Sequence, residues 1–173
     1  MIWIFLTLLI VLPVVLFYWS IVKSLSFYNA ESTLSLAYCF IWGGIIAVVF
    51  SMALGGVFIN AFGWYLDEES IDFFSTVLLA PLIEEIFKGF GILILFLIAL
   101  NNRKGLRGPL SGLVYGGIIG LGFALSEDIG YMMDAAEDSG LLGLLVTFFA
   151  RVILLGLSHT TYTAVVGLGF GYA

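Results

Sequence analysis

Six ionisable residues lie inside long apolar runs of this chain, and they are the groups best suited to do chemistry. They are Glu84, Glu85, Lys88, Glu127, Asp128 and His159. An ionisable side chain at the depth of a bilayer costs several kcal/mol, so it usually marks a functional site and has a partner nearby. Carboxylates that face one another and an imidazole across a helical bundle predict acid–base chemistry on water, or metal binding.

The first group pairs two adjacent glutamates with a lysine. Lys88 follows Glu85 by three residues and Glu84 by four, and both spacings place the partners on one side of a helix. Lys88 can neutralise one carboxylate, which leaves the other suited to act as a general acid or base. A structural ion pair between helices is the alternative, but two adjacent glutamates cost more than such a pair requires.

The second and third groups add a carboxylate and an imidazole. Phe123 and Glu127 are four residues apart and share one helix face, as do His159 and Thr163. A lone histidine in a membrane helix is often a hydrogen-bonded packing residue, but carboxylates in two other apolar runs favour a functional role. Glu127 and His159 are therefore the candidate ligands for Zn²⁺ or another divalent metal ion. Cys39 is the only cysteine, which excludes a zinc–thiolate cluster.

Two further residues have roles that the sequence leaves open. Asp128 points away from Glu127 by one helical step, and it either supports the site from behind or faces a wet vestibule. Arg151 lies eight residues before His159, about two helical turns along a similar face. It could bind a substrate carbonyl or an acidic side chain, or it could extend outward to the membrane surface.

These groups must be positioned by transmembrane helices. The chain has 173 residues, of which 62% are hydrophobic and 10% charged, and its mean hydropathy is +1.17. This composition predicts an all-α, polytopic bundle in a lipid bilayer, with residues 1–173 forming one transmembrane unit. The net charge is −6 and the six Lys and Arg residues are scattered, so we expect no nucleic-acid partner.

Five helical spans fit the apolar runs. They are predicted at about 1–22, within 32–66, and at about 73–101, 109–138 and 147–172, with residue 141 as the alternative start of the last span. Basic residues follow the first and third spans, and they are Lys23, Arg103, Lys104 and Arg107. The segments 67–72 and 134–138 are acidic. The positive-inside rule then places the N-terminus and the acidic segments outside, and the segments 23–31 and 101–108 in the cytoplasm.

The fourth span also carries a packing signal. Gly112, Gly116 and Gly120 recur every four residues. Small residues at this spacing let helix backbones approach closely, which predicts a central place for this span in the bundle.

In chain order, the three groups read Glu84-Glu85-x-x-Lys88, Phe123-x-x-x-Glu127 and His159-x-x-x-Thr163. These motifs on successive helices resemble the PrsW family of intramembrane proteases, over about residues 70–170. The wider superfamily of CaaX-processing and bacteriocin-immunity (ABI) membrane proteins has arginine, histidine and asparagine at three of these places. This chain has Gly89, Glu127 and Thr163 there. The match is therefore to PrsW specifically.

The resemblance implies an enzyme that cleaves membrane-anchored proteins, such as an anti-sigma factor, in a prokaryotic plasma membrane. It implies a catalytic core at about 70–170 in which both glutamates and His159 are catalytic candidates. With Glu127 added from the residue pattern, the predicted catalytic set is Glu84, Glu85, Glu127 and His159. The predicted supporting residues are Lys88, Phe123, Asp128, Thr163 and Arg151. Whether the reaction uses a metal ion or glutamate-activated water alone stays open.

Two other functions compete with proteolysis. A proton-coupled transporter also uses buried acidic residues and histidine as relays, but five short spans show no paired repeat. A non-catalytic membrane scaffold occurs in the wider superfamily, but the presence of both glutamates and Glu127 weighs against it. An intramembrane peptidase is therefore the predicted function.

Overall fold

The computed structural model describes residues 2–26, 31–102, 106 and 108–173, and this part of the chain is helical without strands. In chain order the elements are α1 (Ile2–Ser24), α2 (Thr33–Ile41), η1 (Trp42–Ala47), α3 (Val48–Phe62), α4 (Glu68–Phe74), η2 (Ser75–Leu79), α5 (Ala80–Asn102), α6 (Pro109–Thr147), η3 (Phe148–Leu154) and α7 (Ser158–Tyr172). The η segments are wider, π-helical turns that continue the neighbouring α-helices. The predicted all-α class is confirmed.

Among the described residues, three stretches are long and apolar enough to cross a membrane, namely Ile2–Ser24, Thr33–Phe62 and Pro109–Tyr172. The third has 64 residues and folds back on itself at Gly140, where the backbone has φ 64°. Counted with the first two stretches, the two halves of this stretch and the helical run through α4, η2 and α5 give five helical runs, the number that the sequence predicts, although the run through α5 is not among the three membrane-long stretches.

The predicted start of the last span at residue 147 is wrong. Helix resumes directly after Gly140, because a residue with φ 64° and ψ −146° reverses the chain without a longer loop. The returning helix is then interrupted between η3 and α7, where Leu155 and Leu157 both have ψ near 0°. His159 therefore lies in the first turn of a new helix rather than in the middle of a continuous one.

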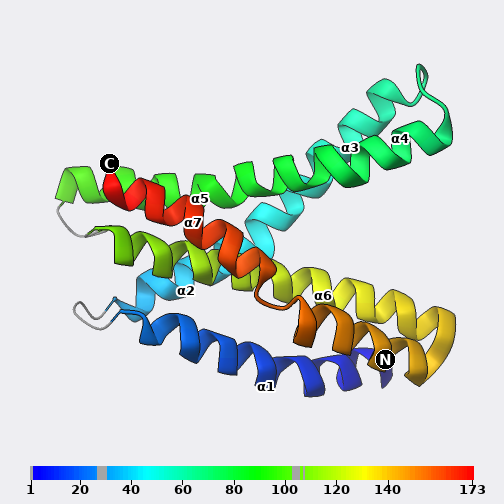
Figure 1. The fold of residues 1–173 in the computed structure, drawn as a ribbon, viewed down its shortest axis with the longest axis horizontal. Helices are drawn as coiled ribbons and strands as arrows, with labels where there is room; N and C mark the ends of the chain where they lie inside the picture. Colours follow the sequence, from blue (N-terminus) through cyan, green and yellow to red (C-terminus); the bar gives the residue numbers. More distant parts are fainter. Residues whose placement is uncertain (1, 27–30, 103–105, 107) are drawn as a thin grey trace.

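The chain turns at two ends of the molecule (Figure 1). α1 finishes and α2 starts at one end, where α5 also finishes and α6 starts. The connection between α3 and α4 and the turn at Gly140 lie at the other end, which we call the acidic end because segments 67–72 and 134–138 are there. Successive turns of the chain thus lie at alternate ends of the molecule, which agrees with the topology predicted from loop charge. Arg103, Lys104 and Arg107, on which that prediction partly rests, lie outside the described residues.

α6 is the central helix, as its glycines predicted, and α7 packs directly on it. A Cβ placed on Gly112 would lie 2.0 Å from the Gly167 carbonyl oxygen, and one on Gly116 would lie 2.2 Å from that of Thr163. A Cβ on Gly120 would lie 2.4 Å from the carbonyl oxygen of His159. Only glycine allows such close antiparallel contact. This contact fixes the position of His159 along the axis of α6.

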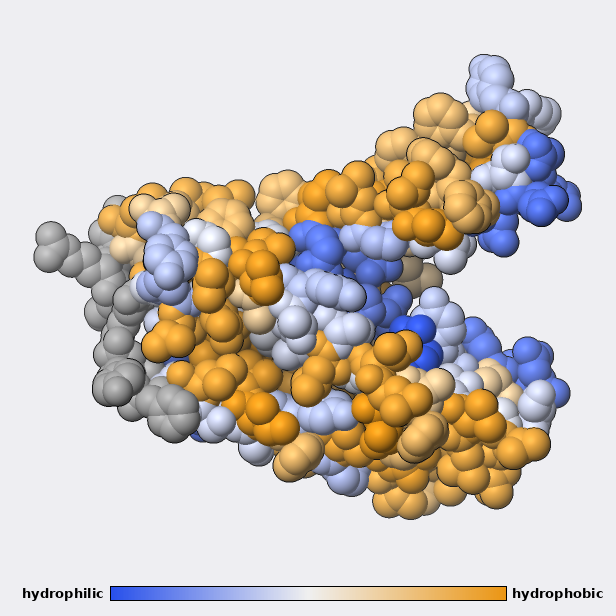
Figure 2. Space-filling model, in the orientation of Figure 1, coloured by the Kyte–Doolittle hydropathy of each residue, from blue (hydrophilic) through white to orange (hydrophobic). Residues whose placement is uncertain are grey.

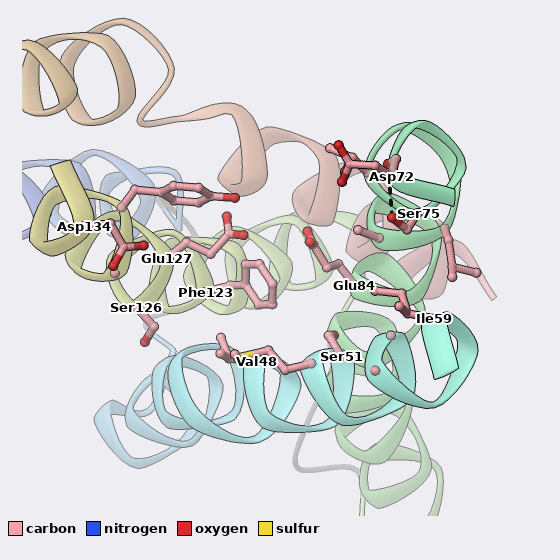
Figure 3. A pocket seen from close by; sticks show the side chains of 18 residues that line it. Val48, Ser51, Ile59, Asp72, Ser75, Glu84, Phe123, Ser126, Glu127 and Asp134 are labelled. Carbon is pink, nitrogen blue, oxygen red and sulfur yellow. Dashed lines mark hydrogen bonds between the residues drawn. The ribbon is translucent and has the colours of Figure 1, made fainter. Parts of the chain in front are cut away.

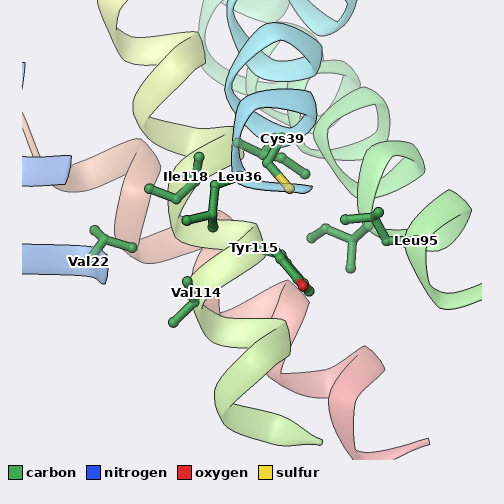
Figure 4. Close-up of a cluster of buried hydrophobic side chains, with 9 residues drawn as sticks. Val22, Leu36, Cys39, Leu95, Val114, Tyr115 and Ile118 are labelled. Carbon is green, nitrogen blue, oxygen red and sulfur yellow. The ribbon is translucent and has the colours of Figure 1, made fainter. Parts of the chain in front are cut away.

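A buried apolar cluster joins α1, α2, α5 and α6 (Figure 4). Cys39 lies in this cluster and is fully buried, in agreement with an ordinary packing role. Beside the cluster, the Ser111 hydroxyl donates a 2.5 Å hydrogen bond to one Glu31 carboxylate oxygen, and the Tyr115 hydroxyl donates to the other. These bonds attach the start of α2 to α6.

The surface divides by polarity (Figure 2). Apolar side chains cover the outer faces of the helices, as expected for contact with lipid. Polar side chains gather in a recess and at two tips. α3, α4 and η2 together form what we call the arm, which diverges from α6 toward the acidic end (Figure 1). The recess lies between the arm and α6.

Candidate active site

The predicted site residues come from separate helices and meet at the inner end of this recess. α5 carries the paired glutamates and Lys88 in its first three turns, α6 carries Phe123, Glu127 and Asp128, and α7 carries His159 in its first turn. Glu84 and Glu127 point toward each other from α5 and α6, with Phe123 between them (Figure 3). Ligand atoms of Glu84, Glu127 and His159 all lie within 4.8 Å of one another.

Lys88 is the centre of the hydrogen-bond network. Its side chain is fully buried, and Nζ lies 2.8 Å from Glu85 Oε1 and 3.4 Å from Glu84 Oε2. The same ammonium lies 2.9 Å from His159 Nδ1 and 3.7 Å from the centroid of the Phe123 ring. A buried ammonium is tolerated only where carboxylates, hydrogen bonds and an aromatic face replace its water, and all three are present.

These contacts also determine which ring nitrogen of His159 carries hydrogen. An ammonium can only donate, so Nδ1 accepts from Lys88. Nε2 then carries the hydrogen and donates it to Glu127 Oε2 at 2.9 Å. The imidazole is thereby held in one orientation between α5 and α6, and its ring lies 5.3 Å from that of Phe123, centroid to centroid.

The two adjacent glutamates face different surroundings. Glu85 accepts a hydrogen bond from the Thr163 hydroxyl at 3.1 Å, in addition to its bond from Lys88. Glu84 has its carboxylate 4.0 Å from His159 Nδ1 and lines the cavity in the recess. Glu85 therefore connects α5 to α7, whereas Glu84 lines the cavity, although Glu85 is the more exposed of the two side chains, at 28% against 16%.

Arg151 binds acidic side chains, one of the roles that the sequence left open. Its Nη2 lies 3.2 Å from Glu127 Oε2 and its Nε 3.2 Å from Asp128 Oδ1. The guanidinium also stacks 3.8 Å above the Tyr131 ring. Asp128 is almost completely buried, so it supports the site from behind Glu127 and does not face a wet vestibule.

The cavity in the recess has a volume of about 680 Å³. α3 and η2 form one wall and α6 the other, with Glu84 and Glu127 exposed to its interior (Figure 3). Water can therefore reach carboxylates that the apolar sequence around them would otherwise isolate. A cavity with convergent polar groups is the usual form of a catalytic site.

The donor set fits a divalent metal ion in chemistry and in charge. Carboxylate oxygens and an imidazole are ligands that Zn²⁺ takes in catalytic sites, and Glu84 joins the predicted pair of Glu127 and His159. Among the described residues, four carboxylates at the site face two cations, Lys88 and Arg151. A divalent ion would balance the remaining charge. Both nitrogens of His159 already make hydrogen bonds, so one of these must open for the ring to become a ligand.

Sequence reasoning missed Tyr131 and the arm residues that line the cavity. Tyr131 is four residues after Glu127, so its place on the same helix face was a usable signal. For Ser51 and Asp72 no such signal exists, because their contribution depends on how the arm diverges from α6.

These helices define a polytopic membrane protein with a buried carboxylate–imidazole site that opens to a cavity. The sequence model of one protein family, described as PrsW family intramembrane metalloprotease, matches residues 31–173. Because this match covers most of the chain, the protein belongs to the PrsW family and is an intramembrane protease. No curated protein and no solved structure matches the chain.

Proposed function

We propose that this protein hydrolyses a peptide bond within or beside the membrane span of an anchored protein. Glu84, Glu127 and His159 act on the substrate, and Glu85, the fourth member of the predicted catalytic set, is a positioning residue. The substrate class is a membrane-anchored regulator of the anti-sigma-factor type, in a prokaryotic plasma membrane, and the catalytic core is residues 70–170. One observation carries the proposal. Glu84, Glu127 and His159 converge within 4.8 Å at a cavity that reaches from the bundle interior to the acidic end.

Glu84 is the general base in this mechanism, because it is the member of the glutamate pair that lines the cavity. Its carboxylate takes a proton from water as the water oxygen attacks the carbonyl carbon of the scissile bond. It then returns that proton to the nitrogen of the leaving amine as the C–N bond breaks. Both transfers use one carboxylate, so the site ends the cycle in its starting state.

His159 and Glu127 stabilise the charge that develops on the carbonyl oxygen. The Nε2 hydrogen of His159 points into the space shared with Glu84 and Glu127, and it can shift from Glu127 to the oxyanion. Glu127 and Lys88 hold the ring in the required tautomer. Where a divalent ion is bound, Glu84, Glu127 and His159 would hold it, and it would polarise the carbonyl group and the attacking water.

The remaining predicted residues position these groups. Lys88 fixes both glutamates and His159, while Thr163 orients Glu85. Arg151 and Asp128 hold Glu127 from the other side. Each of these residues acts through another residue, so each is a positioning residue.

The test is cleavage of a single-span protein by the full chain reconstituted in lipid vesicles, with the products identified by mass spectrometry. The wild type should yield new termini within or next to the span. Glu84→Gln and His159→Ala should each reduce turnover by about 100-fold or more, since each removes a group that acts in the transition state. If both variants cleave at the wild-type rate, the peptidase mechanism is wrong, and a proton-coupled carrier becomes the better explanation of the buried cluster.

A further inference from the structure

The cavity continues from the catalytic cluster to the acidic end as a cleft with two unlike walls. Glu84 and Glu127 lie at its inner end, and Asp72 on the arm and Asp134 on α6 lie on opposite walls nearer the tips (Figure 3). Asp72 precedes Glu84 by 12 residues in one helical run, which corresponds to about 18 Å of helix. The cleft is therefore long enough to hold several turns of a helix beside the site.

The walls of the cleft leave room for a second backbone. A Cβ placed on Gly55 of α3, or on Gly130 of α6, would meet no atom within 4 Å. Small residues with free space in front of them allow a foreign helix to approach closely. The α3 wall is small and apolar at Gly55 and Gly56, so it suits the apolar face of a membrane helix.

Ser51 adds an independent sign that something binds in the cleft. Its side chain lines the cleft and is only 8% exposed, yet its hydroxyl has no hydrogen-bond partner among the described residues. A buried polar atom without a partner costs free energy, so such atoms are normally satisfied by a ligand or by water. Its Oγ is itself buried, so a peptide carbonyl of a bound segment would accept from this hydroxyl once the side chain turns toward the cleft.

The mouth of the cleft is strongly acidic. Its lining residues lie within 48–84 and 123–134, which contain no Lys, Arg or His, and Lys88 and Arg151 bind the carboxylates at the inner end. The acidic residues near its two tips are Asp67, Glu68, Glu69 and Asp72 on the arm, and Asp134, Glu137 and Asp138 on α6. Asp67 is used to cap α4. Asp72 and Asp134 line the cleft itself and face whatever enters it.

We propose that this cleft receives the transmembrane helix of the substrate, and that Asp72 and Asp134 select helices flanked by lysine or arginine at the acidic end. The proposal rests on the proteolytic function proposed above. An acidic mouth lowers the free energy of a bound basic flank and repels an acidic one. Most membrane helices carry their basic residues on the cytoplasmic side. With the acidic end outside, as loop charge predicts, this requirement would reject most helices in the same membrane.

Binding is tested first, independently of cleavage. A photo-reactive residue replaces Met52, which is 73% exposed and lines the cleft, in the full chain reconstituted with a single-span test protein. The matched control position is Leu142, which is 71% exposed and is not among the cleft residues. The test protein should be cross-linked from position 52 and not from position 142. Labelling of lipid alone at position 52 would overturn the proposal.

Selectivity is tested by exchanging charge. Two test proteins share one span, and their flank at the acidic end is four lysines in one and four glutamates in the other. The wild type should cross-link and cleave the lysine form about fivefold better at low salt, with the preference largely lost in 0.5 M salt. The double variant Asp72→Lys, Asp134→Lys should prefer the glutamate form. Lys23→Glu, at the other end of the molecule, should leave the preference unchanged. Equal use of both flanks by the wild type would overturn the proposal.

The space in the cleft is tested by substituting glycines at which an added side chain would meet no other atom of the protein. Gly55→Leu and Gly130→Leu should fold and yet reduce cross-linking by about tenfold, because the new side chain fills the space for the substrate. Gly169→Leu also meets open space, but on α7 away from the cleft, and should have no effect. Normal cross-linking by both cleft variants would contradict the proposal.

The outcomes separate this inference from the proposed function. Selective cross-linking in the cleft without any cleavage would support the docking site and refute the peptidase mechanism. Cleavage that ignores flank charge and Gly55→Leu would support the mechanism and refute the docking site.

Discussion

Glycines have opposite meanings on the two sides of α6. Toward α7, Gly112, Gly116 and Gly120 lie so close to the neighbouring backbone that any side chain would collide with it. Toward the arm, Gly130 faces open space, as does Gly55 on the opposite wall. The contact with α7 fixes the position of His159 along α6, whereas the side toward the arm is open space. Small residues in a membrane protein therefore indicate either a close contact between helices or a space left open beside a helix.

The two adjacent glutamates likewise have different surroundings. Glu85 is bound to Lys88 and to Thr163 of α7. Glu84, one residue earlier, lines the cavity on the open side. Adjacent residues point about 100° apart on a helix, so one acidic pair can serve both sides. In the proposed mechanism Glu85 holds the helices together while Glu84 meets the water.

The largest expected effect comes from replacing a glycine in the close contact between α6 and α7. Gly116→Leu would bring a Cβ within 2.2 Å of the Thr163 carbonyl oxygen, so α6 and α7 must separate. We expect a loss of about 3 kcal/mol or more, enough to prevent folding of most of the protein in detergent. Thermal unfolding and size-exclusion chromatography measure this. Gly169→Leu is the matched control. A Gly116→Leu protein with the wild-type melting temperature would show that α7 does not pack here.

The next effect separates the two glutamates. Glu85→Gln leaves the buried Lys88 with one carboxylate fewer and should lower the free energy of unfolding by about 3 kcal/mol. Glu84→Gln should change stability less, because Glu84 Oε2 lies farther from Nζ, at 3.4 Å against 2.8 Å. Its effect should fall on turnover. Unfolding in detergent and cleavage rates must be measured on both variants. Equal losses of stability would remove the distinction between a glutamate that links two helices and one that lines the cavity.

Much of the site could be predicted because it depends on spacing within single helices. The spacings that join Glu84 and Glu85 to Lys88, and Phe123 to Glu127, survive in the structure because α5 and α6 are regular there. The glycine repeat of α6 also predicted its central position. Local periodicity carries such information without any knowledge of the tertiary structure.

The rest depended on irregular backbone that periodicity does not report. The last span begins six residues earlier than predicted because Gly140 alone reverses the chain. This extra length is accommodated by the π-helical η3 and by the break before Ser158, so His159 still meets Glu127. Counting turns from Arg151 to His159 assumed a continuous helix, and an acidic side chain was named as a possible partner of Arg151 without saying which one. The divergence of the arm likewise follows from tertiary packing and left no pattern in the sequence.

A smaller effect is expected from the hydroxyl that joins Glu85 to α7. Thr163→Val keeps the shape of the side chain but removes the hydrogen bond to Glu85 Oε2, which should cost about 1 kcal/mol of stability. Turnover should fall only slightly, because Lys88 still holds Glu85. Thr161→Val is the control, since the Thr161 hydroxyl donates to the carbonyl of Leu157, the residue that directly precedes its own helix. If the two variants unfold alike, the Thr163 bond contributes nothing to the packed side.

The smallest expected effect lies at the tip of the arm, on the open side. The Ser70 backbone N–H and hydroxyl donate hydrogen bonds of 2.8 and 2.9 Å to the Asp67 carboxylate, and these bonds lower the pKa of Asp67. Because the pKa is lower in the folded state, the cap is fully stabilising above the unfolded value of about 3.9 and is lost as pH falls through the folded value. Amide exchange in the first turn of α4 should therefore speed up in acid, after correction for the intrinsic rate. Asp67→Asn keeps a capping oxygen without a titrating group, so its exchange should show no such change. If wild type and variant respond alike, the arm tip does not depend on this carboxylate, and its acidic charge is free to act on whatever enters the cleft.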